Sequence, residues 1–138
     1  MILRIDWTTV VDKYRVKPDN LSVDTGTRAA LLNEQEWKCP LCGGLPTDPH
    51  HTFLKQSDAP PARRAELFFL FNSLHNLVML CRECHDQRGQ TAEVEIELAK
   101  YKIGLGHDMR DYFLLVESYF PGWNSSAWDK SKREIIFQ

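Results

Sequence analysis

The sequence predicts a single α+β domain, and three observations support this class. First, 138 residues suit one domain with a modest core. Second, two short β-favourable segments, 50–54 and 77–80, each adjoin a C-x-x-C pair. Third, stretches rich in helix-forming residues lie on both sides of these segments. We therefore treat residues 1–138 as one domain, with its core at about residues 37–99.

The first elements lead the chain to the cysteines. Residues 27–37, TRAALLNEQEW, are rich in helix formers and predict a helix that ends near Cys39. Residues 43–49, GGLPTDP, predict a loop because glycine and proline supply turn conformations and break helices. The segments 50–54 and 77–80 are then expected to pair as antiparallel strands.

Helices are predicted for most of the remaining chain. An inserted helix is expected over 60–71, where proline is tolerated in the first turn and the phenylalanines would join the core. A helix should begin near Glu83, break at Gly89 and resume over 91–103 with Thr91 as its N-cap. The last helix is predicted over 108–120, before Pro-Gly, and the two tryptophans that follow are expected to pack against the core.

Two C-x-x-C pairs carry the strongest chemical signal. They are Cys39/Cys42 and Cys81/Cys84, separated by 38 residues. Each pair can present two thiolates from one tight turn, and four thiolates form the tetrahedral shell that structural zinc prefers. Disulfides are the alternative, but the N-terminus does not resemble a secretory signal, and we expect a reducing, cytoplasmic setting. A redox role for the pairs is disfavoured because two pairs flank one hairpin.

Three histidines accompany the cysteines. His50 and His51 lie between the pairs, and His85 directly follows Cys84. Because four sulfurs already complete a zinc shell, the histidines remain available for a second site. Neighbouring residues in a strand point to opposite faces, so His50 and His51 should have different roles.

These residues carry a family resemblance. The order CPLC, then HH, then NLVMLCRECH resembles the HNH endonucleases, a ββα-metal (His-Me) finger group, in a form braced by a zinc ribbon. The similarity covers about residues 39–85 and implies a ββα-metal finger with a four-cysteine zinc site and flanking helices. It also implies metal-dependent hydrolysis of DNA phosphodiester bonds, by nicking or double-strand cleavage, that leaves 5′-phosphate and 3′-hydroxyl ends.

The resemblance also implies individual roles. His51 would be the general base, and Asn76 would hold the hairpin and orient that base. His50 and His85 would be ligands of a catalytic divalent metal. The family often has Asp at the position of His50, so Asp48 stays open as a competing ligand. Two imidazole ligands would favour Mn²⁺ or Ni²⁺ over Mg²⁺, which prefers oxygen.

The charge of the chain bears on its partners. The formal net charge is −2, so any attraction to DNA phosphates must come from a local patch or from a DNA-targeting protein partner. Four arginines are candidate nucleic-acid contacts, although exposed, solvated side chains are the commoner explanation: Arg63, Arg64, Arg82 and Arg88. The alternative function is a zinc-ribbon module that binds nucleic acid or protein without cleaving it.

Overall fold

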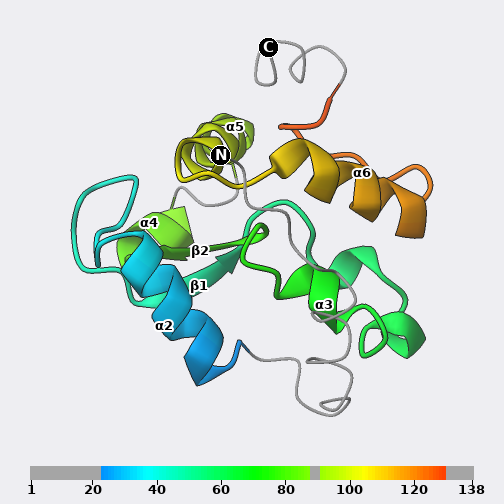
Figure 1. The fold of residues 1–138 in the computed structure, drawn as a ribbon, viewed down its shortest axis with the longest axis horizontal. Coiled ribbons are helices and arrows are strands. Elements are labelled where there is room, and N and C mark those ends of the chain that lie inside the picture. The colour runs from blue at the N-terminus through cyan, green and yellow to red at the C-terminus, as the bar shows by residue number, and fades with distance from the viewer. Residues whose placement is uncertain (1–22, 88–90, 130–138) are drawn as a thin grey trace.

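A two-stranded antiparallel sheet forms the centre of the computed structural model, which describes residues 23–87 and 91–129 (Figure 1). Strand β1 (Asp48–His51) pairs with β2 (Leu77–Leu80). The helices are α2 (Thr25–Glu34), α3 (Phe68–Phe71), α4 (Arg82–Gln87), α5 (Ala92–Gly104) and α6 (Met109–Tyr119), with 3-10 turns at η1 (Gln56–Asp58) and η2 (Pro61–Arg63). The α+β class is confirmed. The expected break at Gly89, like Arg88, lies outside the described residues.

Strand β2 has the predicted bounds, but β1 begins and ends earlier than predicted. Asp48 pairs with Leu80 and His51 pairs with Leu77. The predicted continuation to residue 54 is wrong because the backbone N–H groups of residues 53 and 54 donate to the side-chain oxygen of Asn76 instead of to a strand. The N–H of Thr52 still donates to the backbone carbonyl of Asn76 at 2.9 Å, and the Asn76 side chain then ends the ladder.

Strand β2 is buried on both faces. Leu77 and Met79 pack with Leu31 of α2, whereas Val78 and Leu80 belong to the main core, as the two-residue period of a strand requires. The side chain of Gln35 covers the outer edge: its Nε2 donates to the carbonyl of Met79 at 2.8 Å, and its Oε1 accepts from the N–H of Met79 at 2.8 Å. β2 therefore has hydrogen-bond partners on both of its edges.

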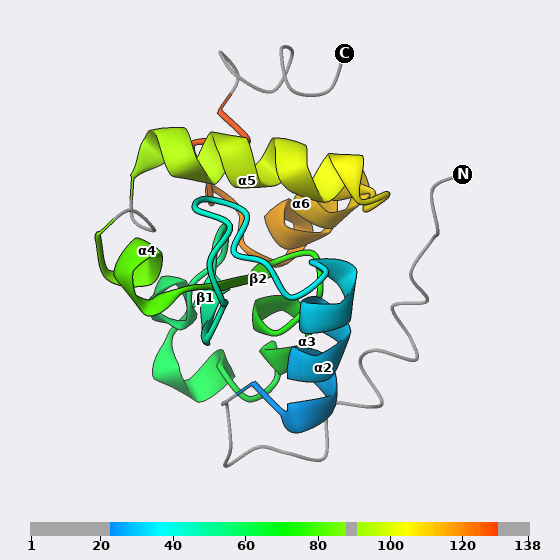
Figure 2. The same cartoon turned by 90° about the vertical axis from the view of Figure 1, so that its left-hand side faces the viewer.

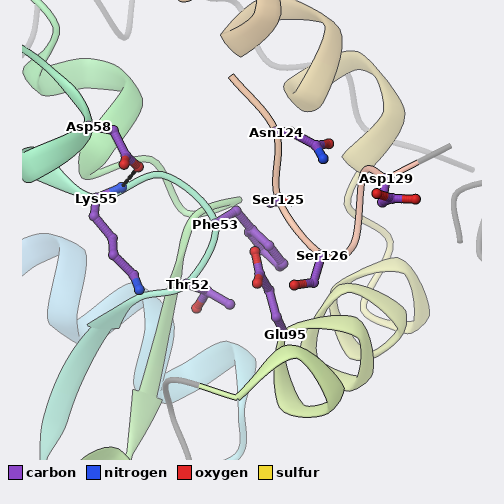
Figure 3. Close-up of a pocket in the computed structure, with 9 residues that line it drawn as sticks. All are labelled: Thr52, Phe53, Lys55, Asp58, Glu95, Asn124, Ser125, Ser126 and Asp129. Carbon is purple, nitrogen blue, oxygen red and sulfur yellow. Dashed lines mark hydrogen bonds between the residues drawn. The ribbon is translucent and has the colours of Figure 1, made fainter. Parts of the chain in front are cut away.

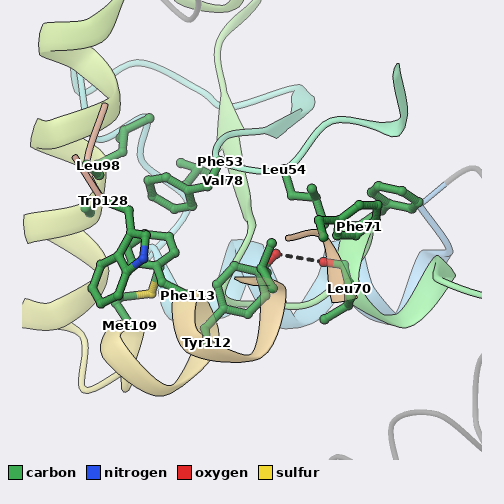
Figure 4. Close-up of a cluster of buried hydrophobic side chains, with 14 of the residues drawn as sticks. Phe53, Leu54, Leu70, Phe71, Val78, Leu98, Met109, Tyr112, Phe113 and Trp128 are labelled. Atoms are coloured by element: carbon green, nitrogen blue, oxygen red, sulfur yellow. Dashed lines mark hydrogen bonds between the residues drawn. The ribbon is translucent and has the colours of Figure 1, made fainter. Parts of the chain in front are cut away.

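The main core lies between the hairpin, α3, α5 and α6 (Figure 4). The ring of Phe53 meets that of Phe113 edge-on at 5.1 Å, and the Tyr112 hydroxyl donates to the carbonyl of Leu70 at 2.9 Å. Trp128 is 3% exposed and packs on Phe113, which confirms that this tryptophan serves packing. In both ribbon views α5 and α6 lie above the hairpin, with α2 and α3 below it (Figures 1 and 2).

Helix boundaries differ from the sequence expectations at two places. Helix α2 ends at Glu34 because Glu36 and Trp37 adopt left-handed backbone conformations, with φ of 54° and 59°. The single helix predicted over 60–71 is wrong: that stretch contains only η2, turns and the short α3. The Arg64 guanidinium donates to the carbonyls of residues 56 and 59 and so holds the chain in a tight loop.

The later helix starts agree with the sequence. The side chain of Thr91 caps α5 by accepting from the N–H of Val94, and Asp108 caps α6 in the same way. Within the described ranges, no helix is both long enough and apolar enough to cross a membrane.

A buried charged cluster joins α2 to α5. Lys102 is 0% exposed, and its ammonium donates to a Glu34 carboxylate oxygen at 2.9 Å and to the carbonyl of Leu74 at 2.7 Å. His107 contacts the other oxygen of Glu34 from the residue before the α6 cap. A buried ammonium is tolerated because a carboxylate pairs with it, so this cluster fixes the helices around the hairpin.

Candidate functional site

Four cysteine sulfurs gather at one end of the hairpin. The Sγ atoms of Cys39, Cys42, Cys81 and Cys84 all lie within 4.8 Å of one another. In the first turn the N–H of Gly43 donates to the carbonyl of Cys39, with Gly43 at a φ of 78° that favours glycine. In the second turn the N–H of Cys84 points at the Cys81 sulfur at 3.3 Å. The cluster can hold a structural metal such as zinc.

The electrostatics of the cluster are compatible with a bound cation. Burial, followed by the neighbouring thiols, raises the pKa of Cys84 to about 12. This shift keeps the metal-free group protonated, whereas a divalent cation bound to the four sulfurs would stabilise them as thiolates. The four cysteines form no disulfide in the structure, and the gathering of all four at one point fits metal binding better than a two-cysteine redox pair.

His50 and His85 come together although they are far apart in sequence. Their rings meet edge-on with centroids 5.4 Å apart. His50 lies on β1 and is 2% exposed, whereas His85 lies on α4, which packs against β1. The Nδ1 of His85 is 3.3 Å from a carboxylate oxygen of Asp86. Such a carboxylate partner is the usual support of a metal-ligating histidine, so the pair fits a nitrogen-ligated cation.

His51 occupies a different environment from His50, as the strand alternation predicts. It pairs with Leu77, on the strand face opposite to that of His50 and Val78. Its Nε2 is 2.7 Å from the side-chain oxygen of Asn72. Burial lowers the pKa of His51, an effect to which His85 adds and which the Asn72 hydrogen bond opposes. The ring is therefore neutral at physiological pH and can accept a proton.

Asn76 braces the chain that follows His51. Its side chain is 0% exposed and makes four hydrogen bonds to backbone groups. Oδ1 accepts from the N–H groups of Phe53 and Leu54 at 2.9 and 2.8 Å, and Nδ2 donates to the carbonyls of Leu54 and Phe71 at 2.7 and 2.8 Å. Asn76 thus holds the hairpin and the insertion together. The side-chain contact to His51 comes from Asn72, so any orienting effect of Asn76 on His51 acts through the backbone.

One pocket of about 320 Å³ brings the three histidines together. It is lined by Pro49, His50, His51, Lys55, Gln56, Ser57 and His85. Asp48 does not belong to this described lining, and its carboxylate lies 3.6 Å from the guanidinium of Arg82 instead. The arrangement therefore favours His50 over Asp48 as the partner of His85.

Of the arginines singled out in the sequence, Arg63, Arg64 and Arg82 lie outside this pocket's described lining. Arg63 pairs with Glu66 at 3.7 Å and lies over the ring of Phe120, and Arg64 binds backbone carbonyls. Lys55 is instead the cation that lines the pocket, and sequence analysis missed it. Asn72 was missed too, because its contact with His51 spans 21 residues and depends on how the insertion folds.

A second pocket has a volume of about 360 Å³ and shares the lining residue Lys55 with the first. Figure 3 shows the residues that line it. Three carboxylates line it, from Asp58, Glu95 and Asp129. Burial raises the pKa of Glu95. Hydrogen bonds from the neighbouring serines lower it, but by less. Because its acidic lining repels phosphate, this larger pocket is a poor candidate for nucleic-acid chemistry, and the histidine pocket is the candidate site.

Comparison with known proteins does not identify a family for this chain. No family model, no curated protein and no solved structure matches this chain. The histidine pocket and the sulfur cluster are the two features of the chain that bear on its function.

Proposed function

We propose that this protein is an HNH endonuclease that uses a divalent metal to hydrolyse DNA phosphodiester bonds. The observation that carries the proposal is the convergence of His50, His51 and His85 on one pocket. They converge on a hairpin that Asn76 braces at one end and four cysteines terminate at the other. This is the order of residues that the HNH resemblance implies for a ββα-metal finger.

The four cysteines are proposed to hold a structural zinc ion. The sulfur cluster supplies a complete tetrahedral shell, which leaves no open position for a substrate. The zinc would therefore stabilise the fold and take no part in the reaction. Cys39 and Cys42 precede β1, whereas Cys81 and Cys84 follow β2. Because Asp48 pairs with Leu80, one ion would join the start of β1 to the end of β2 at the same end of the sheet.

His51 is the proposed general base. Because burial keeps its ring neutral, it can accept a proton from the water that attacks phosphorus. Lys55, which lines the same pocket, would provide positive charge beside the phosphate oxygens. Neither task requires His51 to bind metal, which agrees with its position on the strand face opposite to His50.

His50 and His85 would hold the catalytic divalent metal. Their edge-on rings and the Asp86 contact of His85 suit two nitrogen ligands. Such a cation would neutralise the charge that develops on the leaving 3′ oxygen. Two imidazoles accept Mn²⁺ and Ni²⁺ more readily than Mg²⁺, so activity should be at least as high with Mn²⁺ or Ni²⁺.

Binding to DNA is expected to be weak without help. The formal net charge is −2. Arg63 and Arg82 each lie within ion-pair distance of a carboxylate, which reduces the charge they offer to phosphates. We therefore include a DNA-targeting protein partner in the proposal.

Supercoiled plasmid provides the direct test. The purified, zinc-loaded protein should nick it when Mg²⁺, Mn²⁺ or Ni²⁺ is added and should be inactive in EDTA. His51→Ala should lower the initial rate by about 10²–10⁴-fold, the usual contribution of a general base, while keeping the zinc and the circular dichroism of the wild type. DNA ligase should reseal the nicks, because the ends are expected to be 5′-phosphate and 3′-hydroxyl.

Ser57→Ala is the matched control, since Ser57 lines the same pocket without a titratable group. It should cut at a rate close to that of the wild type. His85→Ala should lose activity together with occupancy of the second metal. Undiminished cleavage in EDTA would contradict the metal mechanism. Wild-type protein that binds DNA without cutting in any metal would instead support the zinc-ribbon binding module.

A further inference from the structure

The side chain of Asn72 hydrogen-bonds to the ring of His51. Its Oδ1 lies 2.7 Å from Nε2 of His51, and the two residues are 21 positions apart. Asn72 is 1% exposed and forms the C-cap of α3, where its N–H donates to the carbonyl of Phe68. Asn72 therefore belongs to the insertion, whereas His51 belongs to the hairpin.

The chemistry of this contact determines which ring nitrogen bears the proton. A carbonyl oxygen of an amide only accepts hydrogen bonds, so Nε2 of His51 must donate. A neutral imidazole has one N–H, and the proton on Nε2 leaves Nδ1 with the lone pair that can accept a proton. Burial of the amide makes the contact strong, because water cannot compete for Oδ1.

We propose that Asn72 is a positioning residue that holds the neutral ring of His51 as the tautomer protonated on Nε2, so that Nδ1 receives the proton of the attacking water. This inference rests on the proposed function for its catalytic part. The same hydrogen bond fixes rotation of the ring about its χ2 angle, because a flipped ring would place a carbon against the amide oxygen. Asn72 thus determines which ring nitrogen of His51 accepts the proton and how the ring is oriented.

Nitrogen NMR on the full chain tests the tautomer directly. Protein with ¹⁵N-labelled histidines is loaded with zinc, kept free of other divalent metals, and recorded at about pH 8, where an unperturbed imidazole is neutral. The His51 signals are identified by their loss in His51→Ala. We expect the shift of a protonated nitrogen at Nε2 and that of an unprotonated nitrogen at Nδ1. The opposite pattern would overturn the inference without any further variant.

Two substitutions then connect the tautomer to the reaction. Asn72→Leu has a similar shape without an acceptor, so the His51 shifts should move toward an average of the two tautomers. Its initial nicking rate should fall by up to about 10²-fold, as for a misplaced catalytic group. Asn72→Asp keeps an acceptor oxygen and should keep the wild-type tautomer and most of the rate. Unchanged shifts in Asn72→Leu would overturn the inference. If wild type shows the expected tautomer but never cuts DNA, only the proposed nuclease function fails.

Discussion

Two of the four side-chain hydrogen bonds of Asn76 are accepted by its oxygen and two are donated by its nitrogen. An isosteric change to aspartate should keep the first two and remove the others. In Asn76→Asp the side-chain oxygen that accepts from Phe53 and Leu54 remains, so two bonds persist. The nitrogen that donates to the carbonyls of Leu54 and Phe71 becomes a second oxygen. That oxygen faces two carbonyl oxygens at 2.7 and 2.8 Å in a side chain that is 0% exposed.

The magnitude follows from counting the groups left without partners. Each buried polar group that loses its hydrogen bond costs about 1–3 kcal/mol, so two carbonyls give about 2–6 kcal/mol. Burying a carboxylate adds to this, unless the group takes up a proton and donates again to one of the carbonyls. Because total stabilities are only about 5–15 kcal/mol, Asn76→Asp should unfold at a much lower urea concentration. Its stability should also recover partly as the pH falls toward the range in which the carboxyl is protonated.

Urea unfolding followed by circular dichroism measures this loss, and Gln35→Glu is the matched control. Gln35, the C-cap of α2, also has a buried amide side chain. Its oxygen accepts from the N–H of Met79 and its nitrogen donates to the Met79 carbonyl, on the edge of β2 away from β1. Both variants should be destabilised, whereas only Asn76→Asp should cut more slowly per folded molecule. If Asn76→Asp were as stable as the wild type, the hydrogen-bond account of the hairpin would be wrong. Equal cutting by the two folded variants would contradict the link from Asn76 to His51.

Two other predictions concern zinc and pH. Cys81→Ser should reduce bound zinc, measured by metal analysis, and unfold the hairpin region, since structural zinc contributes about 10–16 kcal/mol of apparent binding free energy; a stable Cys81→Ser protein without zinc would contradict the structural role. Burial, with His107 and Lys102 nearby, lowers the pKa of His75 to about 3, while the unfolded ring titrates at about 6.5. The unfolded chain therefore binds the extra proton between these values, and stability is full above the upper value and falls as the pH drops through the window. The loss at about pH 5 is roughly 2 kcal/mol, and His75→Gln should remove that part of the pH dependence in urea unfolding; an identical pH dependence in both proteins would show that the ring is not held neutral.

Local sequence signals predicted the parts of the fold that local interactions determine. The caps at Thr91 and Asp108 were predictable because each side chain bonds an N–H three residues later. The end of β1 was not predictable, because it depends on hydrogen bonds to an asparagine more than 20 residues away. The insertion was misjudged for a related reason. Its buried phenylalanines gain more from packing in the core than from continuing a helix, so tertiary contacts override helix propensity.

The candidate site shows the same division. Cysteine spacing predicted the sulfur cluster. One C-x-x-C turn lies before β1 and the other directly follows β2, so pairing of the two strands brings the turns close together. Strand alternation predicted different surroundings for His50 and His51, and their ring partners do differ: His85 for His50 and Asn72 for His51. Lys55 and Asn72 follow no motif, and only the fold of the insertion brings them to His51. Predicting them required knowing where α3 and η1 pack.

The sulfur cluster also bears on the histidine pair, although its proposed zinc has no open position. Helix α4 begins at Arg82, between the two cysteines of the second pair, and carries His85. Cys39 and Cys42 lie just before the loop that leads into β1, which carries His50. A metal that joined the four sulfurs would therefore hold α4 against β1 and, with them, the two histidine rings that lie 5.4 Å apart. Loss of zinc should then weaken binding of the proposed second metal even in molecules that retain most of their helix, because the two proposed nitrogen ligands would no longer be held at one separation.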